Sequence, residues 1–170
     1  MRESQYGVGA FFKTRFSPRV FLDQTISEED FLAILEAGGT APSCFNEQPW
    51  RFILGKKATF LDILTPANAE WAKGADRFIL ICSEPEFKKN SKLNRYAAFD
   101  SGTAWGFMAM EAHVRGIAMH AMAGFDSKRA VEVFKLGDLN PLAVIALGYA
   151  GEAHTMTPRF GLEEVVIDRR

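Results

Sequence analysis

The residues best suited to hold a ligand stand between two prolines, Pro42 and Pro49, just ahead of a tryptophan. Proline restricts its own backbone and that of the preceding residue, so this segment should be a stiff loop. A stiff loop that presents donors and acceptors beside an aromatic ring suits a flat ligand with polar edges. We therefore predict ligand contacts from four residues of the loop: Pro42, Ser43, Asn46 and Gln48.

A second group of polar residues alternates with apolar ones nearer the N-terminus. Arg15, Ser17 and Arg19 occupy every second position, so an extended backbone would place them on one side. Two guanidinium groups flanking a hydroxyl can bind phosphate, because each guanidinium contacts two oxygens at once. A solvated edge strand shows the same alternation, so the pattern alone leaves both interpretations open.

Two further positions complete this set of binding groups. They are the turn at Ala123-Gly124 and Arg159 near the C-terminus. A flavin mononucleotide (FMN) needs cations for its phosphate and hydroxyl or amide partners for its ribityl chain. Its ring needs flat apolar cover with donors at the pyrimidine edge. The set offers each of these classes of contact.

Other kinds of site lack their sequence signals. The chain has no G-x-G-x-x-G motif after a strand, no P-loop and no G-x-S-x-G elbow. His113, His120 and His154 lack the spacing of metal ligands, so we expect packing or solvent roles for them and predict no metal. Cys44 has no cation or base nearby in sequence, which favours a packing role, with a redox role as the alternative.

Composition limits the classes of partner. The 170 residues, 48% of them hydrophobic, predict one α+β domain spanning residues 1–170. A net charge of −1 gives no reason to expect nucleic acid, and no apolar run approaches the ~18–20 residues of a membrane span. The polar N-terminus lacks a signal-peptide pattern, and Cys44 and Cys82 cannot form a disulfide framework. We expect a cytoplasmic protein with free thiols.

The elements that position the first loop have clear signals. A helix should start at the cap Ser27, bury Phe31 and Ile34, and end at Gly38-Gly39. A strand should then begin at Trp50. The loop would therefore connect a helix directly to a strand.

The middle of the chain is less regular. Phe60, Leu61 and Leu64 suggest one short helix, which Pro66 should stop. The apolar run Phe78–Cys82 predicts a central strand buried on both faces. The charged segment from Ser83 to Lys92, with Lys88 and Lys89, is either a solvated loop or a means of attracting the phosphates of a pyridine nucleotide.

A long helix should run from Asn94 to about Val114. It is apolar on nearly every side, which indicates burial within a domain or between subunits. Two strands should follow, at 117–122 and 142–147, with a helix capped by Asp126 between them.

Taken in order, these motifs resemble those of the nitroreductase-like FMN oxidoreductases over roughly residues 10–168. The matching segments are Arg15–Phe21, Pro42–Trp50, Asp100–Gly102, Ala123–Asp126 and Arg159–Glu164. Three features depart from the family pattern. Thr157 replaces a frequent lysine or arginine, Ala121 and Ala123 replace a proline and an acidic residue, and the region over the substrate pocket is short.

The resemblance implies a fold and an activity. The fold would be a central mixed, mostly antiparallel sheet flanked by helices, with the long helix at a dimer interface. A homodimer would hold FMN between subunits, take hydride from NADH or NADPH through flavin N5, and reduce a nitroaromatic compound, a quinone or a similar small acceptor by a ping-pong route. No side-chain acid or base would be required, so no catalytic residue is predicted.

The resemblance also assigns contacts to particular residues. Arg15, Ser17 and Arg19 would hold the phosphate and ribityl chain, and Arg159 would meet the phosphate. Backbone amides at Ala123-Gly124 would face flavin N5 and O4. Three alternatives remain open: a flavin-binding or regulatory protein without turnover, a dehalogenase or flavin-degrading relative, and a flavin-free interaction protein.

Overall fold

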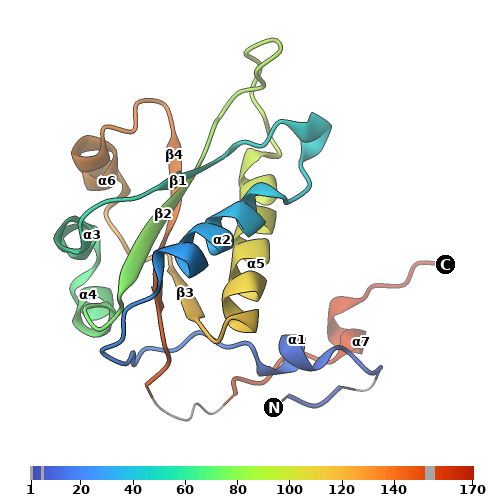
Figure 1. Cartoon of the computed structure of the whole chain (residues 1–170). Helices are drawn as coiled ribbons and strands as arrows, with labels where there is room; N and C mark the ends of the chain where they lie inside the picture. Colours follow the sequence, from blue (N-terminus) through green and yellow to red (C-terminus); the bar gives the residue numbers. More distant parts are fainter. Residues whose placement is uncertain (1, 5, 152–155) are drawn as a thin grey trace.

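Four strands form one antiparallel sheet (Figure 1) in a computed structural model that describes residues 2–4, 6–151 and 156–170. The strands are β1 (Trp50–Ile53), β2 (Arg77–Ser83), β3 (Ala118–Met122) and β4 (Asn140–Gly148). Their order is β1-β2-β4-β3, and each neighbouring pair is antiparallel. The predicted α+β class with a mostly antiparallel sheet is confirmed.

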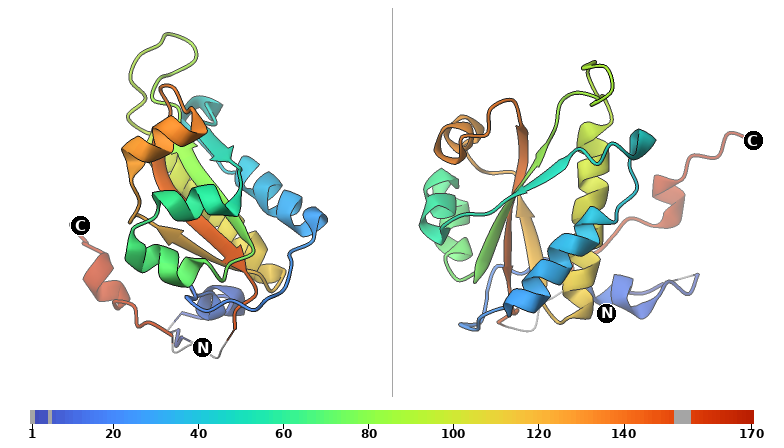
Figure 2. Two further views of the ribbon diagram at one scale, coloured as in Figure 1. Left: turned by 90° about the vertical axis from the view of Figure 1, so that its left-hand side faces the viewer. Right: turned by 45° about the horizontal axis from the view of Figure 1, so that its top comes forward.

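Helices cover both faces of this sheet, as the two views in Figure 2 show. One face carries α3 (Lys57–Ile63), α4 (Pro66–Ala72) and α6 (Ser127–Phe134). The other carries α2 (Glu28–Gly39) and α5 (Ala97–Val114). Three shorter segments are α1 (Ala10–Thr14), the 3-10 turn η1 (Cys44–Asn46) and α7 (Leu162–Val165).

Strand β2 is buried on both faces, as its continuous apolar run predicts. Phe78 and Leu80 belong to the core under α3, α4 and α6, whereas Ile79 and Ile81 belong to the core under α2 and α5. Alternation along an extended strand produces this division, because successive side chains point to opposite faces. The two cores fix both helical layers relative to one sheet.

The two predicted helix caps are confirmed. The hydroxyl of Ser27 accepts a hydrogen bond from the Asp30 N–H at 3.0 Å, and the Asp126 carboxylate accepts one from the Arg129 N–H at 2.9 Å. Each bond satisfies an N–H group that the first turn of a helix leaves without an intrahelical partner. Local sequence therefore sets where α2 and α6 begin.

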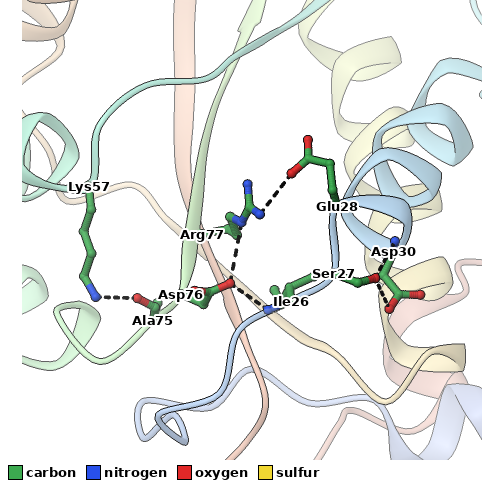
Figure 3. A network of polar contacts seen from close by, with 8 residues as sticks. All are labelled: Ile26, Ser27, Glu28, Asp30, Lys57, Ala75, Asp76 and Arg77. Atoms are coloured by element: carbon green, nitrogen blue, oxygen red, sulfur yellow. Dashed lines mark hydrogen bonds and ion pairs between the residues drawn. The ribbon is translucent and has the colours of Figure 1, made fainter.

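A polar cluster fastens the start of α2 to the start of β2 (Figure 3). The carboxylate of Asp76 accepts from the Ile26 N–H at 2.8 Å, and Arg77 forms an ion pair with Glu28 at 3.0 Å. Helix α2 leads into the loop predicted to bind ligand. This cluster therefore helps to fix the direction from which the chain enters that loop.

Two expectations about local structure were wrong, and one interpretation left open by the sequence does not hold. Pro66 does not stop a helix but begins α4, where the missing N–H of proline costs nothing; α3 has already ended at Ile63. Pro141 lies within β4 rather than before it, opposite Cys82, where the register shifts and the ladder tolerates a missing donor. Residues 15–20 form no edge strand.

Helix α5 has two apolar sides, and this chain covers one of them. Met108 and Ala112 are buried in the core shared with α2. On the opposite side Phe99, Phe107 and Val114 are 76%, 42% and 70% exposed. The helix predicted to be enclosed all round is thus open along one face in the described residues. Within those residues no helix has the length and apolarity to cross a membrane.

Candidate functional site

The loop between Pro42 and Trp50 is held in an unusual backbone conformation. Phe45, Asn46 and Gln48 have φ angles of 52°, 57° and 50°. Residues other than glycine enter this left-handed region at a cost on the order of 1–2 kcal/mol each, with asparagine the best tolerated. Such clustered strain persists only where surrounding contacts enforce it, and it is characteristic of binding sites.

Three hydrogen bonds enforce this conformation. The Cys44 N–H donates to Asp100 at the start of α5 at 3.0 Å, and the Gln48 N–H donates to the Ser43 hydroxyl at 3.0 Å. The side-chain amide of Gln48 donates to the Asn46 carbonyl at 3.2 Å. Ser43 and Gln48 therefore support the loop as well as standing at the predicted contact positions. Asn46 is exposed, and its side chain makes no hydrogen bond to the described residues.

A second set of predicted residues meets at the other end of α5. Burial lowers the pKa of Arg15 below its ordinary value, and the nearby guanidinium groups of Arg2 and Arg159 lower that pKa further. Arg15 also donates to the Ser17 hydroxyl at 3.4 Å. The structure thus brings together Arg15, Ser17 and Arg159, which lie far apart in the sequence.

Arg2 is the member of this cluster that sequence analysis missed. Its guanidinium donates to the carbonyl of Arg15 at 2.7 Å and to the carbonyl of Thr157 at 3.3 Å. It therefore ties the N-terminal segment to the C-terminal one at Thr157. No motif marks Arg2, because the contact depends on how the two ends of the chain meet.

The arginine cluster lacks compensating acids. Among the described residues, no ion pair joins Arg2, Arg15 or Arg159 to an Asp or Glu. Like charges held together in this way are unfavourable unless an anion joins them. A phosphate group, which accepts several guanidinium hydrogen bonds, is the natural counterion.

His113 lies beside this cluster. Its Nε2 is 2.8 Å from the Thr14 hydroxyl, and burial lowers its pKa, with the charge of Arg15 lowering it further. His113 and Arg15 also line a small pocket of ≈ 140 Å³, together with Ile117 and Met119. Burial disfavours any charge here, but the positive charge of Arg15, which also disfavours a protonated His113, would favour an anion.

Arg19 is placed differently from Arg15. It is exposed, and its side chain makes no hydrogen bond or ion pair among the described residues. The segment that carries it is anchored, because Nδ1 of His120 donates to the Pro18 carbonyl at 2.8 Å. The ring of His120 also contacts that of Trp71, with ring centroids 4.5 Å apart and planes tilted by 32°. A structural role for His120 is therefore evident, and His154 lies outside the described residues.

The turn at Ala123-Gly124 is fixed through its carbonyl oxygen. The Gly124 carbonyl accepts from the Thr65 N–H at 3.1 Å and from the Asn68 side chain at 3.0 Å. A Cβ at position 124 would lie 2.6 Å from Asn68 Nδ2, so a larger residue would displace the Asn68 side chain. No loop or side-chain acceptor in the described residues uses the Gly124 N–H, which leaves this donor available for a ligand.

These groups do not form one site within a single chain. The strained loop is bonded to Asp100 and the arginine cluster adjoins His113, so they lie near opposite ends of α5 (Figure 1). Asp100 and His113 are thirteen positions apart in α5, which corresponds to about 20 Å of helix. The predicted site residues therefore occupy two separate regions.

The cysteines and acids offer no competing site. Cys44 and Cys82 are free, and burial raises the pKa of Cys82 to about 12, which keeps its thiol protonated. Among the described residues no cluster of His, Cys, Asp and Glu could hold a metal ion. The site residues described above can therefore bind a ligand through their cations, side-chain amides and backbone N–H donors.

Comparison with known proteins gives a consistent result. The model of the family described as "Nitroreductase family" matches residues 12–64 and 55–149. The crystal structure of an oxidoreductase containing FMN is 30% identical, with a TM-score of 0.92 over 99% of this chain and 95% of that one. An FMN-dependent nitroreductase from Clostridium difficile R20291 is 22% identical, with a TM-score of 0.74 over 87% and 90% of the two chains, and shares the fold. A protein of Archaeoglobus fulgidus named "Putative NADH dehydrogenase/NAD(P)H nitroreductase" is 38% identical over 78 residues, 45% of each chain.

Proposed function

Because the chain belongs to the nitroreductase family, we propose that it is an FMN-dependent oxidoreductase. It would take electrons from NADH or NADPH and pass them to a small electron-poor acceptor, such as a nitroaromatic compound or a quinone. The observation that carries this proposal is the cluster of Arg2, Arg15 and Arg159, which holds three guanidinium groups together without an acidic partner among the described residues. A phosphate monoester is the ligand that such a cluster fits.

The other predicted residues suit the rest of FMN. Ser17, held by Arg15, offers its hydroxyl to the ribityl chain, and Arg19 extends the basic strip with a guanidinium that is free to move. The Gly124 N–H is a fixed backbone donor for a polar ring edge. FMN supplies the hydride-accepting chemistry when bound, so the chain's own residues need only bind, orient and cover it.

A homodimer would join the two separated regions. A two-fold axis perpendicular to α5 near Gly106 would pair this helix with its copy in antiparallel orientation. Asp100 of one subunit would then lie beside His113 of the other, because both stand about equally far from the axis. The strained loop of one chain would meet the arginine cluster of its partner, giving two complete FMN sites.

The open face of α5 supports such a dimer. Phe99, Phe107 and Val114 are exposed on it, and a Cβ at Gly102 or Gly106 would meet nothing within 4 Å. The face continues into a groove of ≈ 700 Å³ that α1, α5 and the C-terminal end of α2 line with mostly apolar side chains. Apolar surface of this extent, with small residues at its centre, is typical of a helix-packing interface.

The test is the visible absorption spectrum of the purified protein with added FMN and then NADPH under anaerobic conditions. We expect bound flavin bands that bleach with NADPH and recover when menadione is added. Bound flavin that NADPH does not reduce would instead identify a flavin-binding protein without turnover. A protein that neither binds FMN nor oxidises NADPH would overturn the proposal.

The role of the arginine cluster is tested by Arg159→Ala, using riboflavin as a ligand without phosphate. We expect the variant to lose at least about tenfold in FMN affinity, because a charge-assisted contact is worth roughly 1.5–3 kcal/mol. Riboflavin affinity and the melting temperature of the apoprotein should change little. An equal loss for both ligands would remove Arg159 from the phosphate site.

A further inference from the structure

The loop formed by residues 84–95 stands beside the strained loop at the same end of the molecule (Figures 1 and 2). It is folded rather than open. The Phe87 N–H donates to the Lys92 carbonyl at 2.8 Å, the Asn94 N–H donates to the Pro85 carbonyl at 2.8 Å, and Ser91 takes a φ of 51°. These hydrogen bonds fix the backbone of the charged segment, and therefore the positions from which its side chains extend.

This second loop is docked onto the strained loop by three contacts. The Lys88 N–H donates to the Glu47 carboxylate at 3.1 Å, and the Lys88 ammonium donates to the Glu47 carbonyl at 2.8 Å. The rings of Phe45 and Phe87 meet edge to face, with centroids 6.2 Å apart. The two loops therefore form one surface.

The aromatic part of this surface is unusually open. Phe45 is 87% exposed although its φ is strained. Neither burial of the ring nor a favourable backbone conformation therefore explains why a phenylalanine stands at this position. Phe87 supports the ring from its edge and leaves a face uncovered. An exposed, supported aromatic face is a platform on which a flat base can stack, with about 1–3 kcal/mol gained per base.

The charged part of the surface is basic. Residues 84–95 contain four cations and two carboxylates. Arg51 pairs with one of these carboxylates, on Glu84, at 3.0 Å. Lys89, Lys92 and Arg95 are exposed and form no ion pair among the described residues, and Glu86 forms none either. The balance favours an anion bound beside the aromatic platform.

An aromatic platform next to unpaired cations is suited to a purine nucleotide that carries a phosphate on its ribose. We propose that Phe45, Lys89 and Lys92 bind the adenosine 2′-phosphate end of NADPH and thereby favour NADPH over NADH. This inference rests on the proposed function, because it names the electron donor of the same site. Phe45 takes the adenine ring, and the two lysines take the 2′-phosphate.

The direct test is binding of adenosine 2′,5′-bisphosphate to the FMN-loaded protein, measured by calorimetry at low salt with 5′-AMP for comparison. Lys89→Glu/Lys92→Glu should weaken bisphosphate binding by about tenfold or more, as expected when cations facing a phosphate are reversed. Lys56→Glu/Lys128→Glu is the matched control, because both lysines are exposed and precede or begin helices, where a carboxylate is tolerated. Phe45→Gly should weaken both nucleotides without lowering the melting temperature, since glycine accepts the positive φ.

Steady-state kinetics with menadione provide the second readout. The KM for NADPH should rise about tenfold in Lys89→Glu/Lys92→Glu, while the KM for NADH changes less than about twofold. Equal shifts for the two donors, or unchanged bisphosphate binding, would overturn the assignment. Tighter binding of a single-stranded oligonucleotide than of the bisphosphate would also overturn it. Turnover with NADPH that is unaffected by the lysine variant would leave the proposed function standing and remove only this site. Bisphosphate binding that depends on the lysines, in a protein that oxidises neither donor, would leave this nucleotide site standing and remove the proposed function.

Discussion

The backbone N–H of Cys44 donates to the carboxylate of Asp100 across 3.0 Å, and this bond fastens the strained loop to the first turn of α5. Asp100 is 4% exposed, so the accepting side of this partly buried bond is shielded from solvent. The loop on one side of it carries three residues at positive φ. Its geometry therefore depends on an acceptor supplied from 56 positions further along the chain.

Asp100→Ala should release this loop. We expect the variant to lose about 1–3 kcal/mol of unfolding free energy, the usual cost of leaving a buried donor without its acceptor. FMN affinity should fall by about tenfold or more, because the ligand would then have to order the loop. Asp100→Asn retains an oxygen that can accept from Cys44 and should keep most of both properties. If Asn behaves like Ala, the charge of Asp100 and not its hydrogen bond is what matters.

The glycine at position 124 gives a second, separable prediction. Gly124→Ala would place a methyl group 2.6 Å from Asn68 Nδ2 and displace the side chain that holds the Gly124 carbonyl. We expect a loss of about 1–2 kcal/mol, from one hydrogen bond and a local shift. Thermal unfolding of a double-mutant cycle measures it. In an Asn68→Ala background Gly124→Ala should cost less than about 0.5 kcal/mol, and additive effects would contradict the proposed clash.

The sequence predicted the elements better than the site. Ser27 and Asp126 were recognisable as caps because capping is decided within four residues, and β2 was recognisable because a central strand is apolar on both sides. Pro66 was misread because proline both ends helices and begins them, and the local pattern did not distinguish the two.

Features of the site that depend on distant contacts had no sequence signal. Phe45 and Gln48 adopt positive φ because bonds such as Cys44 to Asp100 impose it, and neither residue type favours that conformation. Arg2 joins Arg15 only because the two ends of the chain cross there. The separation of the predicted residues into two regions likewise follows from which end of α5 each group contacts, which the motifs alone do not reveal.

Gly106→Leu tests the proposed dimer without disturbing the fold of one chain. A Cβ at Gly106 meets nothing within 4 Å, and leucine is a better helix former than glycine, which is about 0.8–1.0 kcal/mol less favourable than alanine in a helix. The isolated chain should therefore fold at least as well as the parent. At the centre of an α5–α5 contact the added side chain would force the helices apart, so light scattering should show a dimer for the parent and a monomer for the variant. FMN affinity should fall with the dimer, and a dimer that survives intact would place the interface elsewhere.

His113 should report the arrival of a phosphate. Burial and then Arg15 lower the pKa of His113 in the folded apoprotein, so on acidification the unfolded chain binds a proton before the folded chain does. The stability that His113 contributes is present above its unfolded pKa of about 6.5 and is lost as pH falls through the folded pKa.

A phosphate bound at Arg15 would offset the guanidinium charge and raise the pKa of His113. NMR titration of the histidine ring protons, assigned with His113→Gln, should show a value below 6.5 without ligand and a higher one with FMN. Riboflavin should leave that value where it was, and an equal rise with riboflavin would place the phosphate away from Arg15.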